Sequence, residues 1–169
     1  MWLTDWVEPR TGVRVIFCPE VVMQLSRVAK AALTQRESGG ILLGLRRNEN
    51  IEVIALTLPQ IRDRRYRFHF TRHPEGHREL AEHYWRAANG FVDYVGEWHS
   101  HPEFTPHPSY LDKRSWIRLA RKSAPSFMLG LIVGKTALWL GLANKTSVAE
   151  MVPAPEGNPK KPYVAKVSD

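Results

Sequence analysis

Residues 96–112 read Gly-Glu-Trp-His-Ser-His-Pro-Glu-Phe-Thr-Pro-His-Pro-Ser-Tyr-Leu-Asp, and the rest of the 169-residue chain is best understood as the scaffold for this segment. His99 and His101 are two positions apart, and Ser109 and Asp112 follow them before the segment ends. Side chains two positions apart on a strand point the same way, roughly 7 Å apart. The two imidazoles can therefore converge on one ion, and this spacing predicts a metal site.

The residues around the two histidines predict how they are held. Residues 91–98 are rich in β-branched and aromatic side chains, which favours a strand that ends at or just before the histidines. Residues 102–108 contain three prolines and are expected to form a stiff loop. A helix is expected to start at Ser109, because apolar side chains then recur at helical spacing. Asp112 would project from its first turn, back over the histidines.

The three side chains that can bind a metal form a chemically consistent set. Two neutral imidazoles and one carboxylate suit Zn²⁺, and three protein ligands leave the fourth tetrahedral position for water, as in catalytic zinc sites. Each part also has a structural interpretation. Ser109-x-x-Asp112 is a helix capping box, and a lone His-x-His pair is often a surface feature. A residue at a helix start can cap the helix and still face a metal, so both interpretations of Ser109 and Asp112 stay open.

Two sequence motifs resemble those of the JAB1/MPN/Mov34 (JAMM) metalloproteases and occur in the order found in that family. The spacing His99-x-His101-x₇-Ser109-x₂-Asp112 matches the metal motif of that family without a gap. A second signature, a glutamate followed by x-x-Gly-aliphatic-aliphatic-x-Gly, occurs upstream in residues 37–44, which read Glu-Ser-Gly-Gly-Ile-Leu-Leu-Gly. The resemblance covers roughly residues 13–143.

The resemblance implies a role for each of five residues. One zinc ion per chain would be bound by His99, His101 and Asp112. Glu37 would be the general base and acid, and Ser109 would stabilise the oxyanion. Without its family-like context, a glutamate at the mouth of an apolar strand is usually only a solvated strand end.

The resemblance also implies a reaction and partners. Active family members cut the peptide or isopeptide bond after the C-terminal glycine of ubiquitin or a ubiquitin-like protein. The length of the chain and the sequence of residues 96–103 most resemble the small prokaryotic JAMM isopeptidases. These are encoded beside E1- and E2-like proteins in anti-phage operons, including CBASS. The implied partners are a ubiquitin-like tail, its conjugated target and those E1- and E2-like proteins.

Two other classes of function remain as alternatives. A non-catalytic scaffold of the same fold would normally lack metal ligands, and none is missing here. A nucleic-acid-associated relative would use the net charge of +7, which suits nucleic acid or an acidic protein. No nucleic-acid-binding signature accompanies that charge, so a solvated basic face is the favoured interpretation.

Composition predicts one soluble, cytoplasmic domain. Hydrophobic residues at 43% and charged residues at 24% are globular values, and 169 residues suffice for a core. The single cysteine, Cys18, excludes an internal disulfide and a thiolate zinc site, which indicates a reducing compartment. The N-terminal residues lack a signal-peptide pattern, and the longest apolar run, residues 127–133, is too short to span a membrane.

Helices and strands alternate without a strict order, which predicts the α/β (α+β) class with one mixed sheet. The resemblance implies a single MPN/JAMM-like domain with a curved sheet flanked by helices. Strands are expected at 13–18, 40–44, 51–58, 66–70, 91–98, 127–133 and 137–142, and helices at 20–35, 74–89 and from 109 onward. We expect residues 1–12 to be an N-terminal extension that is irregular or packs late onto the core, 13–150 the domain and 151–169 a tail or edge extension.

The remaining histidines form no His-Glu-x-x-His pair of the kind that binds zinc. We expect four of them to be surface or satisfied structural residues: His69, His73, His77 and His83. His107 lies inside the metal loop, where it could line a cleft or steer a substrate.

Overall fold

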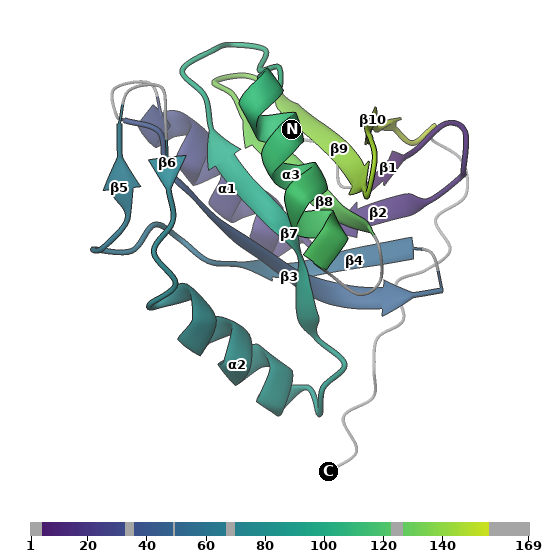
Figure 1. Ribbon diagram of the computed structural model, residues 1–169, viewed down its shortest axis with the longest axis horizontal. Helices are drawn as coiled ribbons and strands as arrows, with labels where there is room; N and C mark the ends of the chain where they lie inside the picture. The colour runs from purple at the N-terminus through teal and green to yellow at the C-terminus, as the bar shows by residue number, and fades with distance from the viewer. Residues whose placement is uncertain (1–4, 33–35, 49, 67–69, 123–126, 156–169) are drawn as a thin grey trace.

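One curved sheet forms the centre of the molecule (Figure 1). The structure is a computed structural model that describes all residues except 1–4, 33–35, 49, 67–69, 123–126 and 156–169. The strands are β1 (Asp5–Val7), β2 (Arg14–Phe17), β3 (Gly39–Arg47), β4 (Asn50–Leu56), β5 (Arg64–Arg65), β6 (Phe70–Thr71), β7 (Asp93–Ser100), β8 (Phe127–Val133), β9 (Leu138–Asn144), β10 (Val148–Glu150) and β11 (Val152–Pro153). The helices are α1 (Pro19–Ala32), α2 (His77–Ala87) and α3 (Tyr110–Lys122).

The main sheet is mixed and nearly closed. Its order is β10-β9-β8-β7-β3-β4-β2-β1-β11, while β5 and β6 form a separate two-stranded ribbon. Two pairs, β2 with β4 and β7 with β8, are parallel, and the other neighbours are antiparallel. The edge strands β10 and β11 are separated in the chain only by Met151, so one short segment joins both edges of the sheet. The α/β class and the curved mixed sheet are confirmed.

The two faces of the sheet bury different cores, because successive strand residues point to opposite faces. On one face, Val21, Leu25 and Ala29 of α1 join the largest core cluster, which includes Leu42 of β3. On the other face, the neighbouring Ile41 packs in the cluster below α2. Helix α3 packs on β8 and β9, on the same face of the sheet as α2. Figure 1 shows α3 in front of β7 and β8, with α1 behind the sheet.

Most expected elements are present in the described residues. The predicted strands at 13–18, 40–44, 51–58, 91–98, 127–133 and 137–142 correspond to β2, β3, β4, β7, β8 and β9. Helix α2 is followed by Gly90, whose φ of 82° suits glycine at a helix end. The predicted strand at 66–70 falls partly on residues 67–69, and the predicted end of the first helix on residues 33–35, outside the described part.

The N-terminal residues decide between the two expectations for residues 1–12. Residues 5–7 form β1 between β2 and β11, and Trp6, only 7% exposed, joins the main core cluster, so packing onto the core is confirmed for this segment. Irregular structure is wrong for residues 5–7, because β1 pairs with its neighbour β2 and with β11 from the far end of the chain. Strand β11 bears out the edge-extension alternative for residues 152–153, and residues 156–169 lie outside the described part. No helix among the described residues is long and apolar enough to cross a membrane.

Candidate metal centre

Strand β7 carries the first two candidate ligands into the centre of the sheet. His99 pairs with Gly39 of β3 on one side and with Ile132 of β8 on the other. His101 directly follows the strand, and its backbone N–H donates to the Val133 carbonyl at 3.0 Å. Both histidines are therefore held by a rigid backbone, with their Nε2 atoms 3.0 Å apart.

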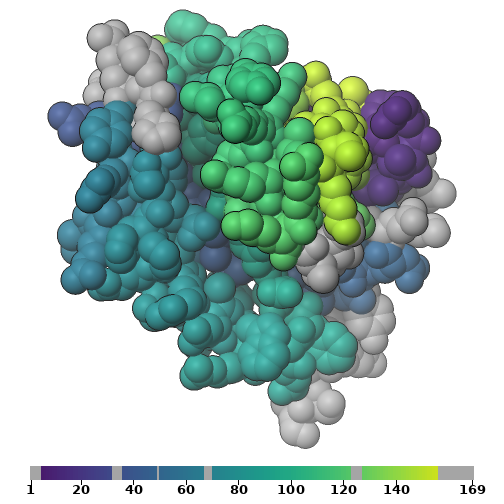
Figure 2. All heavy atoms as spheres, in the orientation of Figure 1, coloured from purple at the N-terminus to yellow at the C-terminus, as the bar shows by residue number. Residues whose placement is uncertain are grey.

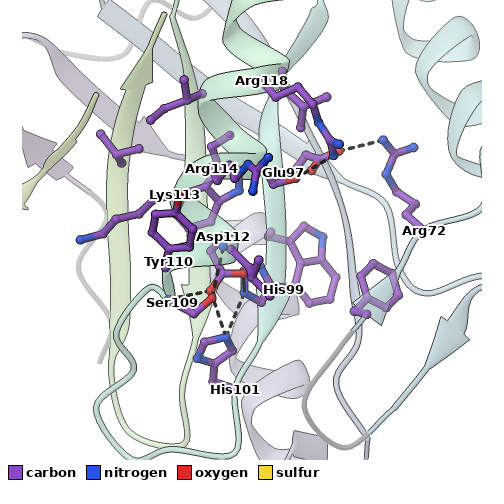
Figure 3. A pocket seen from close by; sticks show the side chains of 18 of the residues that line it. Arg72, Glu97, His99, His101, Ser109, Tyr110, Asp112, Lys113, Arg114 and Arg118 are labelled. Atoms are coloured by element: carbon purple, nitrogen blue, oxygen red, sulfur yellow. Dashed lines mark hydrogen bonds and ion pairs between the residues drawn. The ribbon is translucent and has the colours of Figure 1, made fainter. Parts of the chain in front are cut away.

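Helix α3 supplies the third candidate ligand from its first turn. The Asp112 N–H donates to Ser109 Oγ at 3.2 Å, and the Ser109 N–H donates to Asp112 Oδ2 at 2.8 Å. This reciprocal pair is the predicted capping box. It fixes the start of α3 beside the histidines, as Figure 3 shows.

Trp116 anchors α3 one turn after Asp112. Its ring is 2% exposed and stacks on Trp139 with a centroid distance of 5.6 Å and an interplanar angle of 5°. A Cβ atom on Gly130 of β8 would lie 2.4 Å from the Trp116 ring, so only glycine leaves room for this packing. The Trp116 ring also lies 5.9 Å from the His99 ring, which ties the helix to the histidine strand.

The three candidate ligands have the spacing of a tetrahedral site. Asp112 Oδ1 lies 3.3 Å from His99 Nε2, and Asp112 Oδ2 lies 3.8 Å from His101 Nε2. Two ligands bound at 2.0–2.1 Å to a tetrahedral ion would be roughly 3.3 Å apart. The donor set and its spacing therefore fit a metal ion, and His99, His101 and Asp112 form one group within 4.8 Å of one another.

Glu37 comes to the same site through the register of β3 and β7. Gly39 is paired with His99. The Ser100 N–H donates to the Ser38 carbonyl oxygen at 2.7 Å, which continues this antiparallel pairing by one residue. Glu37 thus lies opposite His101, and directly opposed residues point to the same face. The Glu37 side chain is only 8% exposed and lines the same cleft as the histidines.

Burial changes the proton affinity of Glu37. Burial raises the pKa of Glu37 from 4.5 to about 7; the charge of His99 lowers it, and the carboxylates of Asp112 and Glu103 raise it further. A carboxyl group with a pKa near neutrality can both accept and return a proton at physiological pH. This property suits a general base and acid.

The other carboxylate and one imidazole are shifted toward the forms that bind metals. Burial alone would raise the pKa of Asp112, but the hydrogen bond and charge of His99, with the hydrogen bonds of Ser109, hold it well below its usual range. Burial and the charge of His99 lower the pKa of His101. An ionised carboxylate and a neutral imidazole are the protonation states required for metal binding.

All five residues singled out in the sequence line one cleft with a volume of about 1470 Å³: Glu37, His99, His101, Ser109 and Asp112. The surface is hollowed between α3 and the segment that carries β5 and β6 (Figure 2). A cleft of this size exceeds the roughly 300–1,000 Å³ of small-molecule pockets and suits a peptide.

Sequence reasoning missed two features of the cleft. Glu103 Oε2 lies 3.8 Å from His101 Nδ1, on the side of the ring that faces away from Asp112, so it can help to orient the imidazole. Glu97, two positions before His99 on β7, pairs with Arg72. The strand period of two was a usable signal for Glu97, whereas the distant Arg72 gave none.

The other histidines have structural or surface positions where the structure describes them. His77 is completely buried and satisfied, with Nδ1 2.5 Å from Thr57 Oγ1 and Nε2 3.1 Å from Asp63 Oδ2. His107 is exposed and is not among the described residues that line the cleft. His69 lies outside the described part of the chain.

The fold and the site define a class: a single mixed-sheet domain whose cleft holds an open, three-ligand candidate metal centre with a buried carboxylate beside it. The cleft stands at the end of β7 and the start of α3. Within that class, the chain belongs to the family of prokaryotic homologs of the JAB domain, whose profile matches residues 19–151.

Individual relatives and a solved structure support this family. The chain is 35% identical over 137 residues to a protein of Escherichia coli (strain TW11681) named CD-NTase/cGAS isopeptidase, covering 81% of this chain and 86% of the relative. A protein of the same name from Pseudomonas aeruginosa (strain BWHPSA011 / Pa011) is 32% identical over 142 residues, with 83% and 90% covered. The fold is similar to the solution structure of a Desulfitobacterium hafniense protein at a TM-score of 0.57 and 20% identity, covering 80% of this chain and 88% of that one.

Proposed function

We propose that this protein is a zinc-dependent isopeptidase that cleaves the bond after the C-terminal glycine of a ubiquitin or ubiquitin-like protein. One observation carries the proposal: His99, His101 and Asp112 converge at tetrahedral spacing in the cleft that also holds the buried Glu37. The relatives are named as isopeptidases, which supports the same reaction class.

The donor set favours zinc among the metals that the site could bind. Two imidazoles and a carboxylate from His99, His101 and Asp112 match the ligand types and number of catalytic zinc. When bound, a zinc ion lowers the pKa of a water molecule to about 7 and polarises a carbonyl oxygen.

Glu37 and Ser109 carry the proton and the developing charge. The Glu37 carboxylate accepts a proton from the attacking water as the C–O bond forms, and passes it to the amine nitrogen as the C–N bond breaks. The Ser109 Oγ already accepts the Asp112 N–H, and its own hydroxyl proton is free to donate to the oxygen of the tetrahedral intermediate. The products are a carboxylate and a free amine.

The substrate and the setting follow from the same reasoning. A glycine at the end of an extended tail has no side chain to obstruct the cleft at the cleaved bond, and main-chain hydrogen bonds to a strand edge can set the register of the tail. The relatives are named CD-NTase/cGAS isopeptidase. Together with the family resemblance of the sequence, this name supports a CBASS setting, in which a conjugated target and E1- and E2-like proteins would be the partners. We take residues 13–150, together with β1 and β11 that complete their sheet, as the catalytic unit and the cytoplasm as its compartment.

Metal analysis combined with a cleavage assay tests this function. The purified protein should contain about one zinc per chain by elemental analysis, and it should release a ubiquitin-like protein from a fusion joined through the terminal glycine. Chelation should stop cleavage and added zinc should restore it. Protein that binds no metal and cleaves no fusion would support a non-catalytic scaffold instead.

A substitution at Glu37 tests the chemistry within that function. Glu37→Gln should keep the zinc and the fold but lower kcat by roughly 10²–10⁴-fold, because the amide cannot accept the proton. Glu150→Gln is the matched control, since Glu150 is exposed on β10 and does not line the cleft. Cleavage by Glu37→Gln at the wild-type rate would remove Glu37 from the mechanism.

A further inference from the structure

One end of the cleft is basic. Four arginines line the cleft together with Glu97 of β7: Arg72 directly follows β6, and Arg114, Arg118 and Arg121 belong to α3. Figure 3 shows Arg72, Glu97 and Arg118 at the end of the cleft away from His101. Arg72 and Arg118 therefore share this end with the Glu97 carboxylate.

The arginines lie within reach of a substrate held at the candidate metal centre. Glu97 and His99 are two positions apart on β7, so their side chains point to the same face, roughly 7 Å apart. Arg72 Nη2 lies 2.8 Å from Glu97 Oε1, which places its guanidinium beside that position. An extended peptide rises about 3.3 Å per residue, so this end lies about two to four residues from the scissile bond.

The two arginines of α3 are available to a ligand. Arg114 and Arg118 are four positions apart, so they lie on one side of the helix. Among the described residues, Arg114 has no ion-pair or hydrogen-bond partner for its side chain, and Arg118 only donates to Ser115 Oγ at 3.4 Å. Glu97 is already paired with Arg72, so within the described part of the chain the two exposed guanidinium groups of Arg114 and Arg118 have no carboxylate partner.

We propose that Arg114 and Arg118, with Arg72, select protein substrates that carry acidic side chains about two to four residues from the cleaved bond. The inference rests on the proposed function, because it places the substrate in the same cleft. Guanidinium groups pair with carboxylates in charge-assisted, often bidentate hydrogen bonds, and such pairs discriminate a carboxylate from an amide of the same shape. Selectivity for substrate sequence would then come from α3, beside the candidate catalytic residues.

A binding assay that needs no cleavage tests this selection. The probes are fluorescent peptides of about twelve residues with a Gly-Gly isopeptide bond at the centre. They carry three Glu or three Gln residues on either the glycine side or the lysine side of that bond. They are titrated against zinc-loaded Glu37→Gln protein. The matched variants are Arg114→Gln/Arg118→Gln and, as control, Arg27→Gln/Lys30→Gln, which removes two charges from α1 outside the cleft.

The expected result is tighter binding of the Glu peptide, by about tenfold, on one side of the bond. The preference should disappear in Arg114→Gln/Arg118→Gln and persist in Arg27→Gln/Lys30→Gln. Equal affinities for Glu and Gln peptides, or equal losses in both double variants, would overturn the inference. So would a single-stranded oligonucleotide that binds tighter than every peptide and depends on the same two arginines.

Cleavage measured separately distinguishes this inference from the proposed function. A Glu preference without cleavage by the unsubstituted protein would contradict the function and leave the selectivity standing. Cleavage of Glu and Gln peptides at equal rates and affinities would contradict the selectivity alone.

Discussion

Ser109 combines a structural and a proposed chemical role in one hydroxyl group. Its Oγ accepts the Asp112 N–H at 3.2 Å, and its N–H donates to the Asp112 carboxylate. Ser109→Ala should lower kcat roughly 10²–10³-fold through loss of the oxyanion donor. It should also cost about 1 kcal/mol of stability through loss of the helix cap.

Steady-state kinetics and zinc analysis of the variant check this prediction. Ser109→Thr is the control, because it keeps a hydroxyl for both roles and should retain most of the activity and stability. An unchanged kcat in Ser109→Ala, with zinc still bound, would leave the residue with its capping role only.

Glu37 should make the metal-free protein less stable as the pH rises. Burial raises the pKa of Glu37 to about 7 in the folded chain, above its ordinary value of 4.5. The folded state therefore holds this proton more tightly. The resulting stabilisation is complete below about pH 4.5 and is lost as the pH rises through about 7.

Urea unfolding with a chelator, compared between wild type and Glu37→Gln, measures this effect. The variant should be more stable than wild type by about 1–3 kcal/mol near pH 8, and the difference should vanish near pH 4.5. A difference that does not change with pH would show that the buried carboxyl does not titrate in this range.

The sequence was most informative about the residues of the candidate site, because the spacing of two motifs was enough to identify them. The candidate metal ligands His99 and His101 are separated by one strand period, and Asp112 follows at a fixed distance, so a local pattern was sufficient to bring them together as candidates. Arg72 was not predictable in the same way, since only the folded chain brings it to the histidine strand.

At the scale of elements, the packing of α3 against β8 requires a glycine at position 130. Gly130→Val should force the Trp116 ring away from β8, because a Cβ atom there would lie 2.4 Å from the ring. Overpacking of this kind typically costs about 1–3 kcal/mol. Because Asp112 lies one turn before Trp116, displacement of α3 should also weaken zinc binding.

Competition against a zinc-sensitive dye tests this link. Val15→Ala is the control, because Val15 is fully buried in the core on the other face of the sheet and contributes nothing to the cleft. The control should lose stability but keep its zinc affinity while folded. Equal zinc affinity in Gly130→Val and wild type would show that α3 does not depend on this contact.

For His77, the sequence predicted the kind of role but not the residues that it contacts. It was expected to be surface-exposed or satisfied, and it is satisfied, but in a buried network with Thr57 and Asp63. Thr57 also accepts the Ile41 N–H at 2.9 Å, so the network ties the start of α2 to strand β3. The partners come from three separate segments, and no local pattern indicates that they meet.

At the scale of the whole molecule, β1 and β11 complete the closure of the sheet. Deletion of residues 1–12 would remove the strand that pairs with both β2 and β11, together with the buried Trp6. We expect a loss of about 3–5 kcal/mol, the usual effect of removing a buried aromatic side chain.

Chemical denaturation of the truncated protein checks this expectation. Trp6→Ala in the full chain should reproduce most of the loss, which separates the buried side chain from the strand pairing. Unchanged stability in the truncated protein would mean that residues 1–12 are a dispensable extension.

The class of fold could be predicted from the sequence, but the closure of the sheet could not. Long apolar runs and amphipathic helices indicate a mixed sheet covered by helices. Strands β1, β10 and β11 span only two or three residues each, so they leave no periodic signal, and β1 pairs with β11 across almost the whole length of the chain.

The central claim is that His99, His101 and Asp112 hold one metal ion. A crystal structure of zinc-loaded protein, with anomalous diffraction measured on both sides of the zinc absorption edge, tests it most directly. We predict one anomalous peak within about 2.0–2.2 Å of both Nε2 atoms and an Asp112 oxygen. No peak at these three side chains, or a peak elsewhere in the chain, would contradict the account.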